Sequence, residues 1–144
     1  MPAVKTRYNP RDIVLTLGTF IITGFADGTF INIEQDEDSF SDVSGADGEV
    51  ERAASNDGRA TANITLLQGA DSNSFLASLH AADKLTGQGV VPFLMKDLNS
   101  VDLVTAANAW IIKPAAIERG KEIVGQEWSI RLADAIIFPG GLSL

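Results

Sequence analysis

Hydrophobic and polar residues alternate most regularly between Arg59 and Leu67. Side chains along a β-strand point to opposite faces in turn, so this alternation predicts a strand with one buried and one polar face. The apolar face carries Ala60, Ala62, Ile64 and Leu66, and the polar face carries Arg59, Thr61, Asn63 and Thr65. A strand with one wet face is typical of an antiparallel sheet.

Similar patterns predict further strands. The segment from Asp12 to Phe25 is rich in β-branched residues and is interrupted by Gly18 and Gly24, which indicates a strand, a tight turn and a second strand. Pro92 favours a strand start or an edge strand, because proline cannot donate a backbone hydrogen bond. The remaining predicted strands cover residues 30–35, 90–96, 106–113 and 127–138.

One segment has helical rather than strand periodicity. Apolar residues recur at helical spacing after a run of possible N-cap side chains at Asp71–Ser74, which predicts a helix over Ser72–Lys84 that ends at Thr86–Gly89. With seven or eight strands, the pattern predicts a mainly β fold. We expect an antiparallel β-sandwich or barrel with one flanking α-helix, in a single domain over residues 1–144.

The strand pattern is interrupted by an acidic segment, expected to be an extended loop at about residues 35–58. Eight acidic residues and no basic residue occur between Glu34 and Glu51. Asp36, Asp38 and Asp42 match the first, third and seventh positions of a Ca²⁺-binding loop, but Phe40 at the fifth position offers no oxygen. A loop that faces solvent or a partner is therefore favoured, with Ca²⁺ as the alternative.

Composition and charge narrow the functional classes. The formal net charge of −8 argues against a nucleic-acid-binding protein, although nucleic acid could slide past such a surface. The chain has no cysteine, its one histidine, His80, lies within the predicted helix, and no catalytic or cofactor motif occurs. We therefore expect no enzyme activity, no metal and no cofactor. The first twelve residues lack an apolar leader and no apolar run is long enough to span a membrane, so we expect cytoplasmic synthesis without membrane insertion.

Several strings of the sequence resemble a family of tail tube proteins from contractile-tailed bacteriophages. They include GTFINIEQDEDSFSDVSGADGEVER from Gly28, LLQGADSNSFLASLHAADK from Leu66 and PFLMKD from Pro92. The resemblance continues through Ala109-Trp110-Ile111 and the strand from Glu127-Trp128 to Gly140-Gly141, so that it covers essentially the whole chain.

The resemblance implies a structural role in the virion. Family members are similar in fold to the type VI secretion tube protein, and they form hexameric rings that stack into a tube. The implied partners are further copies of the chain, the tail sheath protein, the tape-measure protein and baseplate components. DNA is implied only as passing cargo, with assembly in the host cytoplasm. A tube subunit of a bacteriocin or type VI secretion particle, and a carbohydrate-binding β-sandwich, are the alternatives.

Two groups of residues are candidates for contacts within such a particle. Alternation places one group on the side expected to line the channel: Asn32, Glu34, Asp36, Thr61, Asn63 and Thr65. Arg59 is the basic exception there, and we expect it near a strand end or paired with an acid. The other group is expected at contacts between subunits or rings: Asp38, Phe40, Asp42, Asp47 and Glu49, with the basic Lys5, Arg7 and Arg11. Trp110 and Trp128 fit core positions, or alternatively interface anchors.

Overall fold

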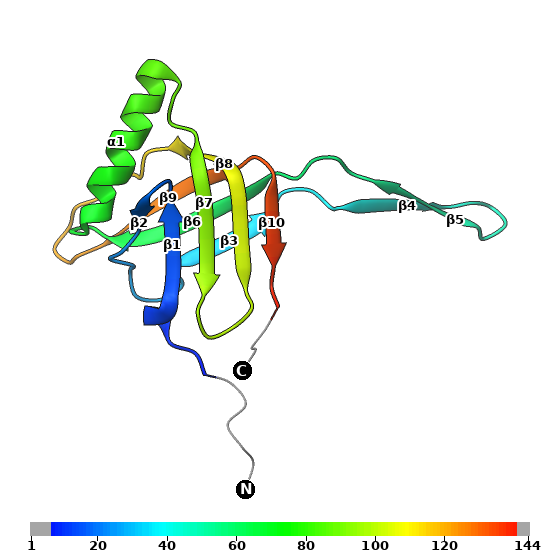
Figure 1. Cartoon of the computed structure of the whole chain (residues 1–144), viewed down its shortest axis with the longest axis horizontal. Helices are drawn as coiled ribbons and strands as arrows, with labels where there is room; N and C mark the ends of the chain where they lie inside the picture. Colours follow the sequence, from blue (N-terminus) through cyan, green and yellow to red (C-terminus); the bar gives the residue numbers. More distant parts are fainter. Residues whose placement is uncertain (1–6, 141–144) are drawn as a thin grey trace, which may run out of the picture.

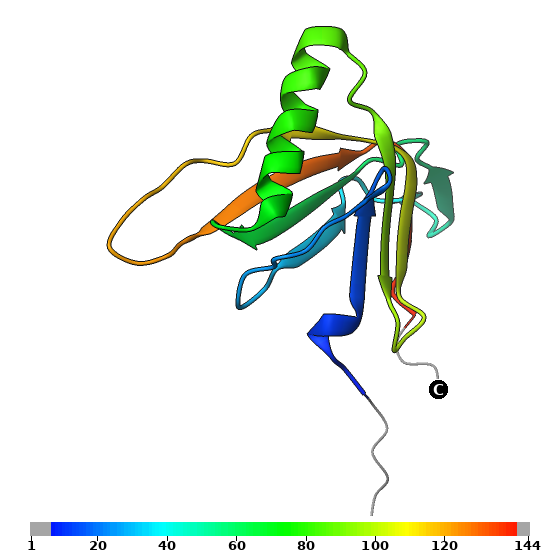
Figure 2. The same cartoon turned by 60° about the vertical axis from the view of Figure 1, so that its left-hand side comes forward.

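Eight strands of the described chain form one antiparallel sheet that folds over into two layers, and two further strands pair separately as a hairpin (Figures 1 and 2). The computed structural model describes residues 7–140. The strand order is β2-β1-β7-β8-β9-β6-β3, and β10 also pairs with β8. The elements are η1 (Pro10–Asp12), β1 (Ile13–Leu17), β2 (Phe20–Ile21), β3 (Ile31–Gln35), β4 (Phe40–Ser44), β5 (Val50–Ala54), β6 (Ala60–Leu67), α1 (Asp71–Thr86), β7 (Val91–Asp97), β8 (Leu103–Lys113), β9 (Gly125–Leu132) and β10 (Ala135–Phe138).

Strand β8 joins the two layers because its partners change along its length. Its residues 103–106 pair with β10 and its residues 109–113 pair with β9, while β7 pairs along its other side. In Figure 1, β1, β7, β8 and β10 run side by side, and β3, β6 and β9 cross behind them. The predicted antiparallel β-sandwich with a flanking helix is confirmed, as a sandwich that remains open along β3.

The core fills the space between the layers, as the alternation predicts. In β6, Ala60, Ala62, Ile64 and Leu66 are each at most 1% exposed. They pack mainly with residues of the other strands, such as Leu15, Phe93 and Ile130, and the helix contributes Leu76 to the same cluster. Burial of β6 therefore depends on the second sheet layer more than on the helix. Trp128 is a core residue, whereas Trp110 is only half-buried.

Helix α1 closes one end of the sandwich. Its predicted range is confirmed to within two residues, but the predicted side-chain N-cap is wrong, because Ala70 is the N-cap residue and no side chain caps it. The candidate cap residues serve tertiary contacts instead. Ser72 Oγ accepts a hydrogen bond from the Thr23 N–H at 2.9 Å, and Asn73 Oδ1 accepts one from Trp128 Nε1 at 2.9 Å. Phe75 stacks on Phe20, with ring centroids 4.2 Å apart.

We predict that Asn73→Ala lowers the free energy of unfolding by about 1–3 kcal/mol, the usual cost of leaving buried polar groups unpaired. Asn73 also donates to the Leu67 carbonyl at 2.8 Å, so the change removes bonds from both Trp128 and β6. Urea denaturation measures the effect, and Ser74→Ala at the adjacent exposed position is the control. Equal stability of the two variants would show that these bonds do not attach the helix.

Two parts of the predicted strand pattern are corrected by the structure. The acidic segment is not simply a loop, because β4 and β5 pair within it as a β-hairpin, from Phe40↔Ala54 to Ser44↔Val50. The segment predicted as one strand over residues 127–138 is two strands, β9 and β10, which belong to different layers. Pro92 lies at the start of β7, as predicted, but β7 is an inner strand with a register shift between Val91 and Phe93.

Candidate functional site

The predicted channel-lining residues share one side of the β3–β6–β9 layer, which we call the polar face. Asn32 pairs with Asn63 and Glu34 pairs with Thr61 across β3 and β6, so their side chains point the same way. Asp36 follows β3 directly, and Thr65 lies on the same side of β6. The assignment of this face to the wall of a channel remains a prediction.

The polar face continues onto β9 with three residues that the sequence analysis missed. Glu127 lies opposite Thr65, Ser129 opposite Asn63 and Arg131 opposite Thr61. Alternation from Gln126 to Leu132 could have identified them, because Gln126, Trp128, Ile130 and Leu132 are buried and the residues between them are not. With Glu34 and Asp36, these three strands hold three acids and the base Arg131, while Arg59 adjoins the face at the start of β6 and Lys113 lies opposite Ser129 on β8.

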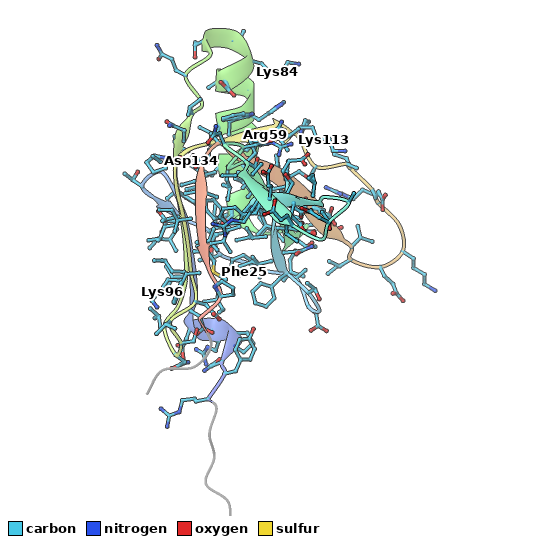
Figure 3. All side chains as sticks on the ribbon, turned by 90° about the vertical axis from the view of Figure 1, so that its right-hand side faces the viewer. Phe25, Arg59, Lys84, Lys96, Lys113 and Asp134 are labelled. Carbon is cyan, nitrogen blue, oxygen red and sulfur yellow. The ribbon has the colours of Figure 1, made fainter. Side chains whose placement is uncertain are left out.

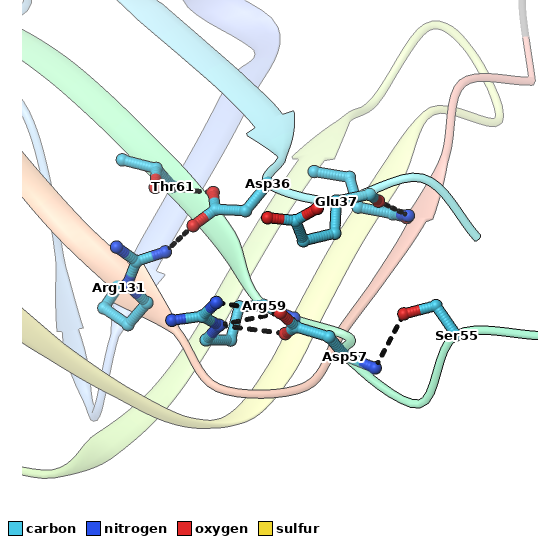
Figure 4. A network of polar contacts seen from close by, with 8 residues as sticks. Asp36, Glu37, Ser55, Asp57, Arg59, Thr61 and Arg131 are labelled. Carbon is cyan, nitrogen blue, oxygen red and sulfur yellow. Dashed lines mark hydrogen bonds and ion pairs between the residues drawn. The ribbon is translucent and has the colours of Figure 1, made fainter. Parts of the chain in front are cut away.

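Hydrogen bonds tie the three strands of the polar face together (Figure 4). Asp36 accepts a hydrogen bond from Thr61 Oγ1 at 2.8 Å and forms an ion pair with Arg131. Asn63 Oδ1 accepts one from Ser129 Oγ at 2.8 Å. The hydrogen bond from Thr61, followed by that from Arg131, lowers the pKa of Asp36, so this carboxylate stays charged and neutralises the arginine.

A second ion pair lies where the chain returns from the hairpin to β6. Arg59 Nη2 lies 2.8 Å from Asp57 Oδ2, and Arg59 Nε also donates to this carboxylate. These bonds lower the pKa of Asp57 to about 2, and the same contact raises the pKa of Arg59. The expectation that Arg59 lies near a strand end and is paired with an acid is confirmed.

The lowered pKa values predict that the hairpin base loosens only in strong acid. A carboxyl whose pKa is lowered in the folded state stabilises the fold when the pH is above its unfolded pKa, which is near 3.9 for Asp. This contribution is lost as the pH falls through the folded-state pKa, which is about 2 for Asp57. Carbon-detected NMR titration should therefore place the Asp57 midpoint near 2. Arg59→Gln should move this midpoint upward, and an unchanged midpoint would contradict the assigned ion pair.

The acidic contact candidates all belong to the projecting hairpin. Both strands are exposed at every position, and Asp38, Phe40, Asp42, Asp47 and Glu49 lie on or beside them. The Arg52 guanidinium lies 4.5 Å from the centroid of the Phe40 ring, and Asp42 is opposite Arg52 in the register. Figure 1 shows the hairpin extending away from both sheet layers. The hairpin therefore packs on neither sheet layer of its own subunit, and its contact with a neighbouring molecule remains a prediction.

The basic contact candidates lie elsewhere. Arg7 and Arg11 are exposed near η1, at the opposite end of β1 from the helix, and Lys5 lies outside the described residues. The two ion pairs within residues 7–140 involve neither arginine, so any pairing with the acidic hairpin would have to come from another subunit.

A metal site and a membrane-spanning helix each have structural requirements that can be checked against the described residues. Within residues 7–140, no three His, Cys, Asp or Glu side chains are grouped as metal ligands would be. His80 is half-buried in the middle of α1. No helix among the described residues is long and apolar enough to cross a bilayer.

Comparison with known proteins shows similarity to structural proteins of phages and injection particles. No protein-family model matches the chain. Structural protein ORF10 of Pseudomonas phage KPP10 is 25% identical to this chain in an alignment 152 residues long. The alignment spans 98% of this chain and 86% of that protein.

Two solved structures share the fold. The cap that terminates the tube of the anti-feeding prophage has a TM-score of 0.62 at 13% identity, covering 96% of this chain and 95% of that one. The sheath/tube terminator of the PVC extracellular contractile injection system, in its extended state, has a TM-score of 0.62 at 13% identity, covering 94% of this chain and 99% of that one. At this level of identity the two structures demonstrate a common fold.

Proposed function

We propose that this chain is a structural subunit of the tail of a phage or a related contractile injection particle, where it forms rings of the tail tube. The observation that carries the proposal is the polar face, which lies between two unpaired strand edges, one on β3 and one on the end of β8. Full-length similarity to a phage structural protein and a fold shared with two tube terminators support it.

One unpaired edge is that of β3. The Phe30 carbonyl accepts a hydrogen bond from the Thr65 N–H at 2.9 Å. The Asp36 N–H donates one to the Arg59 carbonyl at 3.0 Å. Hydrogen bonding alternates along an antiparallel pair, so the backbone groups of Ile31 and Ile33 point away from β6, on the side where β3 has no partner strand. An open edge of this kind invites pairing with another chain.

The other unpaired edge belongs to the end of β8. Pairing with β7 extends only to Val91↔Ala109, so residues 110–113 have β9 on one side and no strand on the other within the described chain. Backbone hydrogen bonds between β3 of one copy and residues 110–113 of β8 in the next copy would join the β3–β6–β9 layers of the two copies into one sheet. Such a head-to-tail contact closes into a ring when the rotation between copies divides a full turn.

In a ring closed in this way, the polar face becomes the wall of the channel. In this wall the Asn, Ser and Thr side chains are neutral and Arg131 is paired with Asp36, which leaves Lys113, opposite Ser129 on β8, as a base that forms no ion pair among the described residues. DNA could then slide with little exchange of counterions. The sheath, tape-measure and baseplate proteins are the further partners of this proposal, with the virion tail as its location and no catalytic role.

A subunit that terminates the tube is the second candidate, favoured by the names of the two similar structures. The two roles differ in what the purified protein forms by itself. A tube subunit should stack into long tubes, whereas a terminator should stop at single rings. A tube subunit of a particle without a genome is a third possibility, and tape-measure and capsid genes beside this one would argue against it.

Sedimentation velocity over a wide range of concentrations tests the proposal, with negative-stain microscopy of the same samples. We expect ring-sized species that increase with concentration, and rings or tubes on the grid. A single 15.3 kDa species throughout would contradict self-assembly.

A further inference from the structure

The β4–β5 hairpin and the loop between β8 and β9 lie at opposite ends of the long axis of the molecule (Figure 1), and both expose apolar side chains. At one end the β4–β5 hairpin exposes Phe40, Val43 and Val50, which are 53%, 62% and 64% accessible. At the other end, the loop between β8 and β9, residues 114–124, exposes Ile117 and Ile123, which are 80% and 72% accessible. We call this second region the loop end. Exposed apolar groups gathered in this way mark surfaces that bind partners.

The hairpin has no surface of its own subunit to pack against. It projects from the base of β3 and β6, and every residue of its two strands is exposed. A two-stranded hairpin is at most marginally stable alone in water, so this one needs a docking surface. Residues 34–52 have a net charge of −7, because they contain eight acids and the single base Arg52. The docking surface should therefore combine apolar contacts with positive charge.

The loop end offers both properties. A shallow apolar pocket of about 400 Å³ lies there, lined by Gly24, Leu67, Gln68, Gly69, Ala70 and Ile123. Lys113, where β8 runs into the loop (Figure 3), is joined by Arg119 and Lys121. Together with Glu118 and Glu122 they give residues 113–122 a net charge of +1, in a chain whose net charge is −8. Neither Lys113 nor Lys121 forms an ion pair among the described residues.

The direction of the hairpin is fixed in the free subunit. Its outgoing leg is held by the ion pair between Asp36 and Arg131, and its returning leg by the pair between Asp57 and Arg59 (Figure 4). Beside them, the Ala135 N–H donates to the Gly58 carbonyl at 3.0 Å. A Cβ at Gly58 would lie 2.4 Å from Asp134 Oδ1, so the returning leg passes tightly over the β9–β10 turn. An arm held at its base requires less ordering when it binds.

We propose that the hairpin of one copy docks on the loop end of a second copy, with Phe40 and Val50, which share one face of the hairpin, against the pocket at Ile123 and the acidic residues beside Lys113, Arg119 and Lys121. The hairpin and the loop end lie at opposite ends of the molecule, so one copy cannot satisfy its own hairpin and the contact runs head to tail. The inference rests on the proposed self-assembly and adds to it the surface that receives the hairpin.

Disulfide trapping tests this contact directly, because the natural chain contains no cysteine. Val50→Cys combined with Ile123→Cys should give a ladder of cross-linked multimers when assembled protein is oxidised, and no ladder after reduction. Val50→Cys combined with Leu85→Cys, a position 86% exposed at the end of the helix, is the control and should lack the ladder. Assembled protein that gives no ladder with the first pair, or an equal ladder with both, would overturn the contact while leaving self-assembly intact.

Charge reversal supplies a second test that does not depend on cross-linking geometry. Glu49→Lys with Glu51→Lys in the hairpin, or Lys113→Glu with Lys121→Glu at the loop end, should each weaken self-association at low salt by at least about tenfold, because like charges then face each other. A chain that carries both pairs of changes should recover association. Failure of this recovery, while each reversed chain remains folded by circular dichroism, would overturn the proposed pairing. A wild-type chain that stays monomeric would instead contradict the proposed function itself.

Discussion

Replacing residues 40–54 by a two-residue Asn-Gly turn is expected to give a folded subunit that no longer stacks into tubes. The replacement fits the backbone, because the Ser55 N–H already donates to the Ser39 carbonyl at 2.8 Å. It removes strands that are exposed throughout and contribute nothing to the core. We therefore expect the free energy of unfolding to change by about 0.5 kcal/mol or less, as for surface changes in general.

Negative-stain microscopy and sedimentation measure the loss of assembly, and thermal unfolding followed by circular dichroism checks the fold. The matched control keeps the hairpin and changes only two exposed hydroxyls, Ser41→Ala and Ser44→Ala. The control should form tubes like the natural protein. Tubes of ordinary length without the hairpin would mean that the acidic segment has no part in assembly.

Lysines at Asn63 and Thr65 are expected to permit assembly but to block passage of the genome. Both side chains are half-buried in the middle of the polar face, and neither points into the core. In the proposed channel the two changes add two positive charges per subunit, repeated around every ring. Each lysine that contacts a phosphate must be released again as DNA moves, so we expect genome delivery to fall by at least about tenfold.

The double variant Asn63→Gln and Thr65→Gln is the control, because it adds bulk at the same positions without charge. Particles carrying either double variant would be counted by microscopy and their infectivity would be compared per particle. The lysine particles should be intact and poorly infectious, and raised salt should partly restore release of DNA from them in vitro. Equal infectivity of the lysine and glutamine particles would contradict the assignment of this face to the channel.

Local patterns in the sequence were sufficient to predict most individual elements. Period-two alternation predicts both the position of β6 and the side on which each residue lies, and helical spacing places α1 to within two residues. The same rule applied to residues 126–132 would have added Arg131 to the polar face. Apart from Asp134, residues 132–138 are all apolar and do not alternate, which favours one long strand where the chain in fact turns from one layer to the other.

Long-range pairing and the acidic hairpin could not be derived in the same way. The ion pair between Asp36 and Arg131 joins residues far apart in sequence, and only the β3–β6 and β6–β9 registers together bring them close. The hairpin strands, FSDVS and VERAA, mix apolar and polar residues and have no buried face, so no regular apolar period marks them. Their one local signal is the turn before Glu49, where Gly48 adopts a φ of 91°.

A three-dimensional reconstruction of the assembled wild-type protein by electron cryomicroscopy tests the central claim most directly. The proposal predicts rings in which β3 of each copy lies beside the end of β8 in the next, with Asn63, Thr65 and Ser129 facing the central channel. Rings that place these side chains on the outer wall, or buried against another subunit, would contradict it.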